Sequence, residues 1–404
     1  MGAPVYLIRG RRVLADSPQL QDALADVYDT PERPRCMCVD GGVDMYVVKL
    51  RQYVIKRMPG TGTRHHASCE SYEPDYGQSG LGALMGEAVV QHAADLVELH
   101  IDFPFTLKAG RRPEPGAPGD SIPSEVKVPK QRMSLRAVMH YLFERAAFNR
   151  WYPAMLNKRN QQVLHKYLGM AAAEIRTKGM LLSERLLVPE AYSDSRRDQI
   201  FRDRRSQLQQ LYPGGGSDET KLQLVVGEFK GVEDGPGGLR VWIKHMPDVP
   251  LSIDAKAWNT IRKRYEPWFH AASADLPAKP RLILGALVYA RREHSYAIET
   301  ASCMLTTANW IPVEGSHELD LLDALTVQGR RFVKPLRYDA PTAGQFANVL
   351  LLDTGPEPTP LHVISGYADV RERKAKERLL SANPSLWVWN TAEAMPDLPP
   401  ALPT

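Results

Sequence analysis

Apolar residues recur along the chain with two periods, and the change of period marks the predicted elements. Runs rich in Val, Ile, Leu and Tyr predict strands, and apolar residues at every third or fourth position predict helices. The predicted strands lie at residues 3–8, 44–58 (one or two strands), 101–108, 221–233, 238–246, 281–293, 295–313, 346–354, 361–365 and 386–390. The predicted helices lie at residues 17–28, 79–100, 134–151, 157–178, 195–212, 253–269, within 316–328 and at 369–380. This mixture predicts a multidomain protein of the α+β or α/β class.

Polar and glycine-rich stretches divide this pattern into parts. At 404 residues the chain is longer than one typical domain. We expect an N-terminal module with a flanking helix and strand at 1–108, a linker or loop at 109–130 and a helical region at 131–213. A C-terminal α/β part follows at 214–392, after a run of three glycines, and a Pro-rich tail at 393–404 is predicted to be disordered.

The N-terminal part contains the chain's densest group of metal-ligating residue types. Three of the four cysteines, Cys36, Cys38 and Cys69, lie in one short stretch with the adjacent histidines His65 and His66. Cysteine thiolates and histidine imidazoles are the usual ligands of structural zinc. Glycines at 41–42 and 60–62 can supply the turns that bring the two halves of the stretch together. The pattern predicts a zinc site formed by Cys36, Cys38, Cys69 and one of the two histidines.

Two alternatives to this site stay open at the level of sequence. The cysteines can be free thiols that serve as small apolar side chains. A zinc ion can also be catalytic, which would require an open coordination position and a nearby general base. Four available protein ligands favour a structural ion.

Composition bounds the class of protein. The net charge is +4, which is mild for this length, so only local clustering of charge would indicate a nucleic-acid partner. No apolar run approaches the roughly 20 residues that a membrane-spanning helix needs, and the first residues do not resemble a secretory signal. With few cysteines, these features predict a cytoplasmic protein without a membrane partner.

One predicted helix is rich in arginine. The helix at 195–212 and its first turn carry five arginines, at Arg196, Arg197, Arg202, Arg204 and Arg205. Such a helix could follow the phosphates of DNA or RNA. The competing interpretation, which we favour, is a solvated helix face on which Asp198 pairs with Arg202 at helical spacing.

Two stretches resemble parts of metal-dependent nucleases, which hold Mg²⁺ with carboxylates near a lysine. Glu228 and Lys230 alternate on a predicted strand, so their side chains share one face, but no upstream acid is suitably placed. Asp353 ends a later strand, and the pattern around it resembles a restriction-endonuclease-like fold. His362 stands where that fold would place a glutamate, so we expect a degenerate site.

Three short motifs resemble a known bacterial family. Cys36-Met37-Cys38, the stretch at 57–62 and the stretch from His65 to Glu73 are similar to domain-of-unknown-function family 1173, and the later stretches at 244–254, 330–339 and 350–363 are also similar. The resemblance implies that Cys36, Cys38 and Cys69 are the family's three N-terminal cysteines, and it favours His65 over His66 as the fourth ligand. It also implies a link to plasmids and other mobile elements, and it assigns no activity.

These expectations lead to three hypotheses of function. The first is a non-enzymatic zinc protein of a bacterial mobile element that binds nucleic acid through basic surface. The second is a Mg²⁺-dependent endonuclease that uses Glu228 and Lys230, or Asp353. The third is a scaffold that binds other proteins in a conjugation or defence complex.

Overall fold

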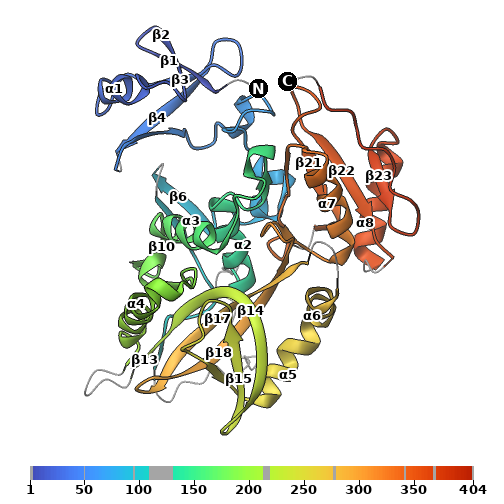
Figure 1. Ribbon diagram of the computed structural model, residues 1–404. Helices are drawn as coiled ribbons and strands as arrows, with labels where there is room; N and C mark the ends of the chain where they lie inside the picture. Colours follow the sequence, from blue (N-terminus) through green and yellow to red (C-terminus); the bar gives the residue numbers. More distant parts are fainter. Residues whose placement is uncertain are drawn as a thin grey trace, which may run out of the picture.

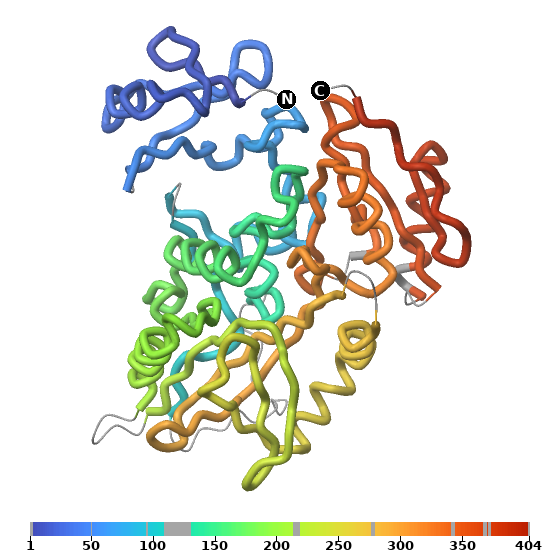
Figure 2. Tube along the Cα trace, viewed as in Figure 1, coloured from blue at the N-terminus to red at the C-terminus, as the bar shows by residue number. Residues whose placement is uncertain are grey.

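The computed structural model describes residues 3–49, 51–93, 96–108, 131–212, 219–275, 279–340, 343–366 and 370–402. In these residues the chain forms eight α-helices and five β-sheets, which confirms the mixed α+β class. The predicted linker at 109–130 and the three glycines at 214–216 lie outside the described residues. Figures 1 and 2 show the N-terminal sheet at one end of the molecule and the long strands between residues 223 and 306 at the opposite end.

The N-terminal sheet has five strands in the order β2-β1-β3-β4-β5. These are β1 (Val5–Ile8), β2 (Arg11–Leu14), β3 (Arg35–Cys36), β4 (Val43–Lys49) and β5 (Tyr53–Arg57). The predicted strand region 44–58 is thus an antiparallel hairpin of β4 and β5. Helix α1 (Leu20–Ala25) packs on the sheet through a small apolar cluster formed by Ile8, Val13, Leu24 and Val27.

The prediction of a helix at 79–100 is wrong. Short 3₁₀ turns at Tyr76–Gln78 and Gly80–Ala83 lead instead into β6 (Val89–Ala93) and β7 (Leu96–Leu99), which pair antiparallel. Gly80 lies so close to the carbonyl of Arg337 that a Cβ there would stand 1.9 Å from its oxygen. This close approach holds the segment in a turn, and the β-branched valines that follow favour strands.

The middle of the chain contains three helices and several very short strands. The helices are α2 (Leu135–Arg145), α3 (Gln161–Ala173) and α4 (Arg197–Gln209). The short strands are β8 (Thr106–Lys108), β9 (Arg150–Trp151), β10 (Ile175–Thr177), β11 (Met180–Leu181), β12 (Leu186–Leu187) and β13 (Glu219–Lys221). Ser134 caps α2, as expected, by accepting a hydrogen bond of 3.1 Å from the backbone N–H of Ala137. Strands β6, β7, β10 and β11 form one sheet, and β8 pairs with β13.

Five strands after residue 220 close into a barrel. They are β14 (Gln223–Gly235), β15 (Gly238–Ile243), β16 (Leu251–Ile253), β17 (Arg281–Arg292) and β18 (Ser295–Thr306). Strand β14 pairs antiparallel with β15, β15 pairs antiparallel with β16, and β16 pairs parallel with β18. Strand β18 then pairs antiparallel with β17, and β17 returns to β14. This ring is the five-stranded Greek-key barrel of OB-folds.

The long strand β14 and the helices between β16 and β17 allow the five strands to close into a barrel. The first half of β14 pairs with β17 and its second half pairs with β15, with a register shift between Phe229 and Gly231. Such a shift bends a strand, so that one strand can serve both sides of a barrel. The predicted helix at 253–269 is broken at Tyr265 into α5 (Ala255–Arg264) and α6 (Glu266–Ser273), which connect β16 to β17.

The C-terminal sheet has the strand order β23-β22-β21-β20-β9. Strands β20 (Phe332–Val333), β21 (Val349–Leu351) and β22 (Thr359–Ile364) run antiparallel, and β23 (Trp387–Asn390) runs parallel to β22. Helices α7 (Leu319–Val327) and α8 (Val370–Ala382) flank this part of the chain, and β19 (Pro312–Val313) pairs with the end of β18. A restriction-endonuclease-like fold here stays a prediction.

The chain end differs from the disorder predicted for it. Met395 and Leu398 pack against the apolar cluster of the C-terminal sheet. The indole of Trp387 donates a hydrogen bond of 2.9 Å to the carbonyl of Asp397, and the N–H of Leu402 donates one of 2.8 Å to the carbonyl of Asp353. Because apolar side chains are spaced between the prolines, residues 393–402 lie along the sheet.

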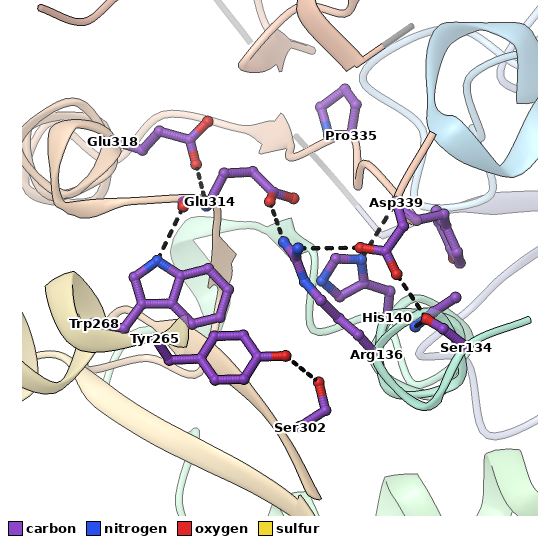
Figure 3. A network of polar contacts seen from close by, with 12 residues as sticks. Ser134, Arg136, His140, Tyr265, Trp268, Ser302, Glu314, Glu318, Pro335 and Asp339 are labelled. Carbon is purple, nitrogen blue, oxygen red and sulfur yellow. Dashed lines mark hydrogen bonds and ion pairs between the residues drawn. The ribbon is translucent and has the colours of Figure 1, made fainter. Parts of the chain in front are cut away.

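A polar network joins the barrel helices to the rest of the molecule. Arg136 of α2 pairs with Glu314 at 2.5 Å and with Asp339 at 3.1 Å, and its guanidinium lies 5.0 Å from the ring centre of Trp268. Figure 3 shows Arg136 between the two carboxylates, with Trp268 of α6 alongside. The carbonyl of Glu314 accepts a hydrogen bond of 3.2 Å from that indole. The network therefore links α2, α6 and the segment before α7, beside a cavity of about 700 Å³.

Candidate metal centre

Four predicted ligands come together between the N-terminal sheet and the loop that follows it. Cys36 lies on β3, where it is paired with Tyr6 of β1 and Val43 of β4. Cys38 follows two residues later. His65 ends a 3₁₀ turn at Gly62–Arg64, and Cys69 lies in the next turn, in which its N–H donates to the carbonyl of His66 at 2.8 Å. Two local pairs of ligands thus approach from two separate segments.

Glycines form the turns that place these ligands. Gly41 and Gly42 have φ values of +79° and +70°, which side-chain-bearing residues rarely adopt. A Cβ on Gly42 would also lie 2.9 Å from the Sδ of Met37 and 3.3 Å from the carbonyl oxygen of Cys36. In the second segment Gly60 has a φ of +69°. The turn after the Cys-Met-Cys stretch therefore requires glycine for both its conformation and its packing.

Three of the distances within the cluster are close to the edges of a tetrahedral metal site. One ligand atom from each of Cys36, Cys38, His65 and Cys69 lies within 4.8 Å of all the others. The Sγ atoms of Cys36 and Cys69 are 3.7 Å apart, and the Nδ1 of His65 is 3.3 Å from the Sγ of Cys38 and 3.7 Å from that of Cys69. Metal–sulfur bonds of about 2.3 Å and metal–nitrogen bonds of about 2.0 Å give tetrahedral edges of about 3.8 Å and 3.5 Å. The four side chains lie together and could hold a metal ion.

The structure distinguishes the two histidines. His65 is 3% exposed and faces the sulfurs with its Nδ1. His66 instead points its Nδ1 at the hydroxyl of Ser68, 2.8 Å away. The backbone N–H of Ser71 donates to the Sγ of Cys69 at 3.4 Å, a contact that favours a thiolate. Of the two histidines, His65 is the one that completes the cluster.

The three sulfurs compete for negative charge. Hydrogen bonds with the other two sulfurs, above all with Cys36, lower the pKa of Cys38. The hydrogen bond with Cys38, together with burial, raises the pKa of Cys36 to about 11, and the pKa of Cys69 is raised in the same way by Cys36 and Cys38. A divalent cation at the centre would remove this competition, because it stabilises every thiolate that it contacts.

The cluster also connects distant parts of the fold. Cys69 packs against a buried cluster in which Ala67 and Tyr72 of its own loop meet Tyr152, Val333 and Leu352 of the body. The loop is held there by a hydrogen bond of 3.2 Å from the N–H of Ala67 to the carbonyl of Pro356, and by one of 3.2 Å from Arg331 to the carbonyl of Ser68. Cys36 and Cys38 belong to the N-terminal sheet, so the four ligands join that sheet to the C-terminal part of the molecule.

The candidate nuclease residues do not join a metal cluster. Among the described residues, the group of three or more possible ligands is the one formed by the cysteines and His65, and it includes neither Glu228 nor Asp353. Glu228 is buried and pairs with Lys244 at 2.5 Å and with Arg281 at 2.8 Å. The side chain of Asp353 is 7% exposed and accepts two hydrogen bonds from Arg330, at 2.8 and 3.0 Å. Both carboxylates are thus occupied by basic side chains.

The arginines at the start of α4 and along it differ in their surroundings. Arg204 is buried, pairs with Asp248 and donates to the carbonyl of His245 at 2.7 Å. Arg196 pairs with Glu190 at 2.6 Å, and Arg202 donates to Gln199 at 2.9 Å. Arg197 lies over the ring of Phe201, and Arg205 is exposed. Arg204 therefore fastens α4 to the barrel.

A second set of basic residues gathers around Lys230, and the sequence did not single it out. Lys244, Arg262 and Lys279 line the same cavity as Lys230, on the flank of the barrel. These residues are far apart in sequence and come from different elements. The sequence contains one indication of this site, which is the alternation of residues in the strand around Trp242. Because Val241 and Ile243 are buried, Trp242 and Lys244 on the same strand face outward.

Comparisons with known proteins place almost the whole chain in one family. The family described as "Protein of unknown function (DUF1173)" matches residues 6–392. No curated protein matches the chain. None of the helices in the described parts has the length and apolar character that crossing a membrane requires.

Proposed function

Because the chain belongs to the DUF1173 family, whose function is unknown, we propose a function from its geometry. The protein uses a structural zinc ion, held by Cys36, Cys38, His65 and Cys69, to fasten its N-terminal sheet to the body. The observation that carries this proposal is the set of sulfur–sulfur and sulfur–nitrogen distances of 3.3 to 3.7 Å.

The donor set favours zinc over harder cations. Thiolates and imidazole suit zinc, whereas Mg²⁺ and Ca²⁺ prefer oxygen ligands. Four protein ligands also complete a tetrahedron and leave no position for a substrate, which is the arrangement of structural sites. The chain's own residues then have a mechanical role: β3 presents two ligands, and the docked loop presents the other two.

Metal analysis of the purified protein tests this proposal. We expect about one zinc per chain, and we expect Cys36→Ala to lose it. Cys303→Ala is the matched control, because this fourth cysteine is buried in β18 and lies outside the cluster. Protein that carries no zinc after purification, and takes up none when reduced and supplied with it, would contradict the proposal.

A second function, nucleic-acid binding, is favoured by the barrel. Barrels with this connectivity commonly bind oligonucleotides or oligosaccharides across their second and third strands, which are β15 and β16 here. The test is the affinity of the full chain for DNA and RNA at several salt concentrations, because phosphate contacts give an affinity that falls steeply with salt. An affinity that does not change with salt would argue against binding through basic surface.

The other hypotheses stay predictions. A Mg²⁺-dependent nuclease with a restriction-endonuclease-like C-terminal part would need Glu228 or Asp353 to exchange its basic partners for a metal. A link to a plasmid or another mobile element is an expectation from the family resemblance. A cytoplasmic location and a scaffold role in a conjugation or defence complex are expectations from the sequence that nothing in the structure tests. A nuclease assay with and without Mg²⁺ on the protein and its Glu228→Gln and Asp353→Asn variants separates the enzymatic hypothesis from the binding one.

A further inference from the structure

The flank of the barrel carries a cavity of about 490 Å³ with an excess of positive charge. Its wall comes from β14, the end of β15, helices α5 and α6, and the segment before β17. Four basic residues line it, namely Lys230, Lys244, Arg262 and Lys279, together with His270. Glu228 is the carboxylate among the lining residues.

The positive charge of this cavity is largely uncompensated. Glu228 already pairs with Lys244 at 2.5 Å and with Arg281 at 2.8 Å, so its negative charge is neutralised by these two cations. Among the described residues, Lys230, Arg262 and Lys279 form no ion pair. Like charges in one concave site repel each other and raise the local potential for an anion. The cavity is therefore suited to a negatively charged group.

An aromatic wall accompanies these cations. The rings of Phe229, Trp258 and Phe269 line the cavity and pack against one another with centroids 5.3 to 5.8 Å apart. Trp258 is 2% exposed, and its indole Nε1 is buried without a hydrogen-bond partner in the described part of the chain. These rings form an apolar side of the cavity next to its cations.

An outward-facing tryptophan lies beside the cavity on β15. Val241 and Ile243 belong to the core of the barrel, so Trp242 between them faces outward, where it is half-buried. It is opposite Gly231 of β14, a residue that also lines the cavity. Lys244, two positions further along the same strand, shares the outward face. A flat aromatic surface is thus next to a site for an anion.

We propose that this face of the barrel binds single-stranded nucleic acid, with a backbone phosphate in the cavity lined by Lys230, Lys244, Arg262 and Lys279 and a base stacked on Trp242. The inference rests on the nucleic-acid binding proposed above and specifies its site and its form of ligand. Aromatic side chains can stack on bases that are free of a partner, whereas the bases of a duplex are covered by their neighbours. The barrel connectivity places the cavity next to the strands that carry ligands in this type of fold.

Fluorescence anisotropy of the full chain tests the site. The probes are a labelled single-stranded oligothymidine, a single-stranded RNA of mixed sequence and a DNA duplex, each measured at several salt concentrations. We expect Trp242→Ala to weaken single-strand binding by between about 5-fold and 150-fold. We expect the double variant Lys230→Glu and Lys279→Glu to weaken binding at least about 10-fold. It should also reduce the slope of log affinity against log salt by about 0.7, the value for one phosphate contact on a single strand.

A matched pair on α3 supplies the control. Lys166 lies 5.4 Å from the ring centre of Tyr167, which is 43% exposed, so this pair presents a cation and an aromatic ring outside the barrel. Lys166→Glu and Tyr167→Ala should leave binding unchanged. A thermal unfolding midpoint close to that of the wild type shows that each variant is folded.

The outcomes distinguish this site from nucleic-acid binding in general. If the wild-type protein binds none of the three probes, nucleic-acid binding itself is overturned, and this site with it. If the wild type binds but the barrel variants bind equally well, while Arg197→Glu or Arg205→Glu on α4 weakens binding, the barrel site is wrong and the general function stands. Tighter binding to the duplex than to either single strand would overturn the assignment of a single-stranded ligand.

Discussion

The Sγ atoms of Cys36 and Cys69 lie 3.7 Å apart although 33 positions separate the two residues in sequence. Cys36 is part of the N-terminal sheet, whereas Cys69 packs against the buried residues Tyr152, Val333 and Leu352. This pair therefore marks the point at which the sheet meets the body.

Removal of the metal should loosen the N-terminal sheet while the barrel stays folded. Without a cation the cluster's thiolate charges are no longer neutralised, and the loop at 60–72 loses its link to β3. Hydrogen exchange in the presence of a strong zinc chelator should become faster in residues 5–72 and change little in β14–β18. Equal acceleration in both regions would show that the centre stabilises the whole chain. No acceleration anywhere would contradict a structural role.

The adjacent histidines provide a matched test of the ligand set. His65→Ala should lower zinc affinity by about 100-fold or more, because one of four ligands is lost. His66→Ala should retain the metal, since His66 contacts Ser68 rather than the sulfurs. Competition with a chromophoric chelator measures both affinities. Metal loss from the His66 variant alone would reverse the assignment.

Loss of Arg136 from the polar network around α2 should lower the stability of the protein. Burial by itself would raise the pKa of Glu314, but Arg136, followed by His140, outweighs this effect and lowers that pKa to about 2. Arg136→Ala would leave a buried carboxylate without its main partner, at a cost of about 3 kcal/mol in the free energy of unfolding. Urea denaturation at pH 7 measures the change.

Two further variants show whether the cost comes from the unpaired charge. Replacement of both partners, as Arg136→Met with Glu314→Leu, should recover most of the lost stability. Arg196→Ala removes an ion pair whose arginine side chain is 55% exposed, so it should cost less than about 1 kcal/mol. Equal losses for Arg136→Ala and Arg196→Ala would show that burial of Glu314 does not matter.

Stability should fall between pH 6.5 and pH 4 because of two buried histidines. Burial lowers the pKa of His140 to about 4, and burial together with nearby Lys376 lowers that of His362 to about 4. Each ring is neutral in the folded protein but takes up a proton in the unfolded chain below about pH 6.5, so its contribution is complete above that pH and is lost as the pH falls. At pH 5 the loss is about 2 kcal/mol for each histidine.

The variant His140→Asn separates this effect from other acid-sensitive groups. The Nδ1 of His140 accepts a hydrogen bond of 3.3 Å from the N–H of Tyr338, and an asparagine oxygen can accept in its place. The difference in unfolding free energy between pH 7 and pH 5 should be about 2 kcal/mol smaller in this variant than in the wild type. An unchanged difference would show that His140 does not titrate as proposed.

Features that depend on neighbouring residues could be predicted from the amino-acid sequence. Ser134 starts α2, the glycines after Cys38 form a turn, and the alternating residues of 44–58 form a hairpin. The types of ligand in the candidate metal centre, and their grouping into two pairs of residues close in sequence, could be predicted for the same reason. Each depends on backbone preferences and side-chain chemistry within a few positions.

Features that depend on contacts between distant segments could not be predicted from the sequence. The helix predicted at 79–100 gave way to turns and strands because Gly80 packs against Arg337, far along the chain. Glu228 next to Lys230 resembled a catalytic pair, yet Lys244 and Arg281 neutralise this glutamate once β14 is paired with β15 and β17. Likewise, only the orientation of the two rings showed that His65, and not His66, faces the sulfurs. The cavity near Trp242 forms only when the barrel closes. Spacing along a chain predicts local geometry, whereas these outcomes follow from strand pairing and from packing between separate segments.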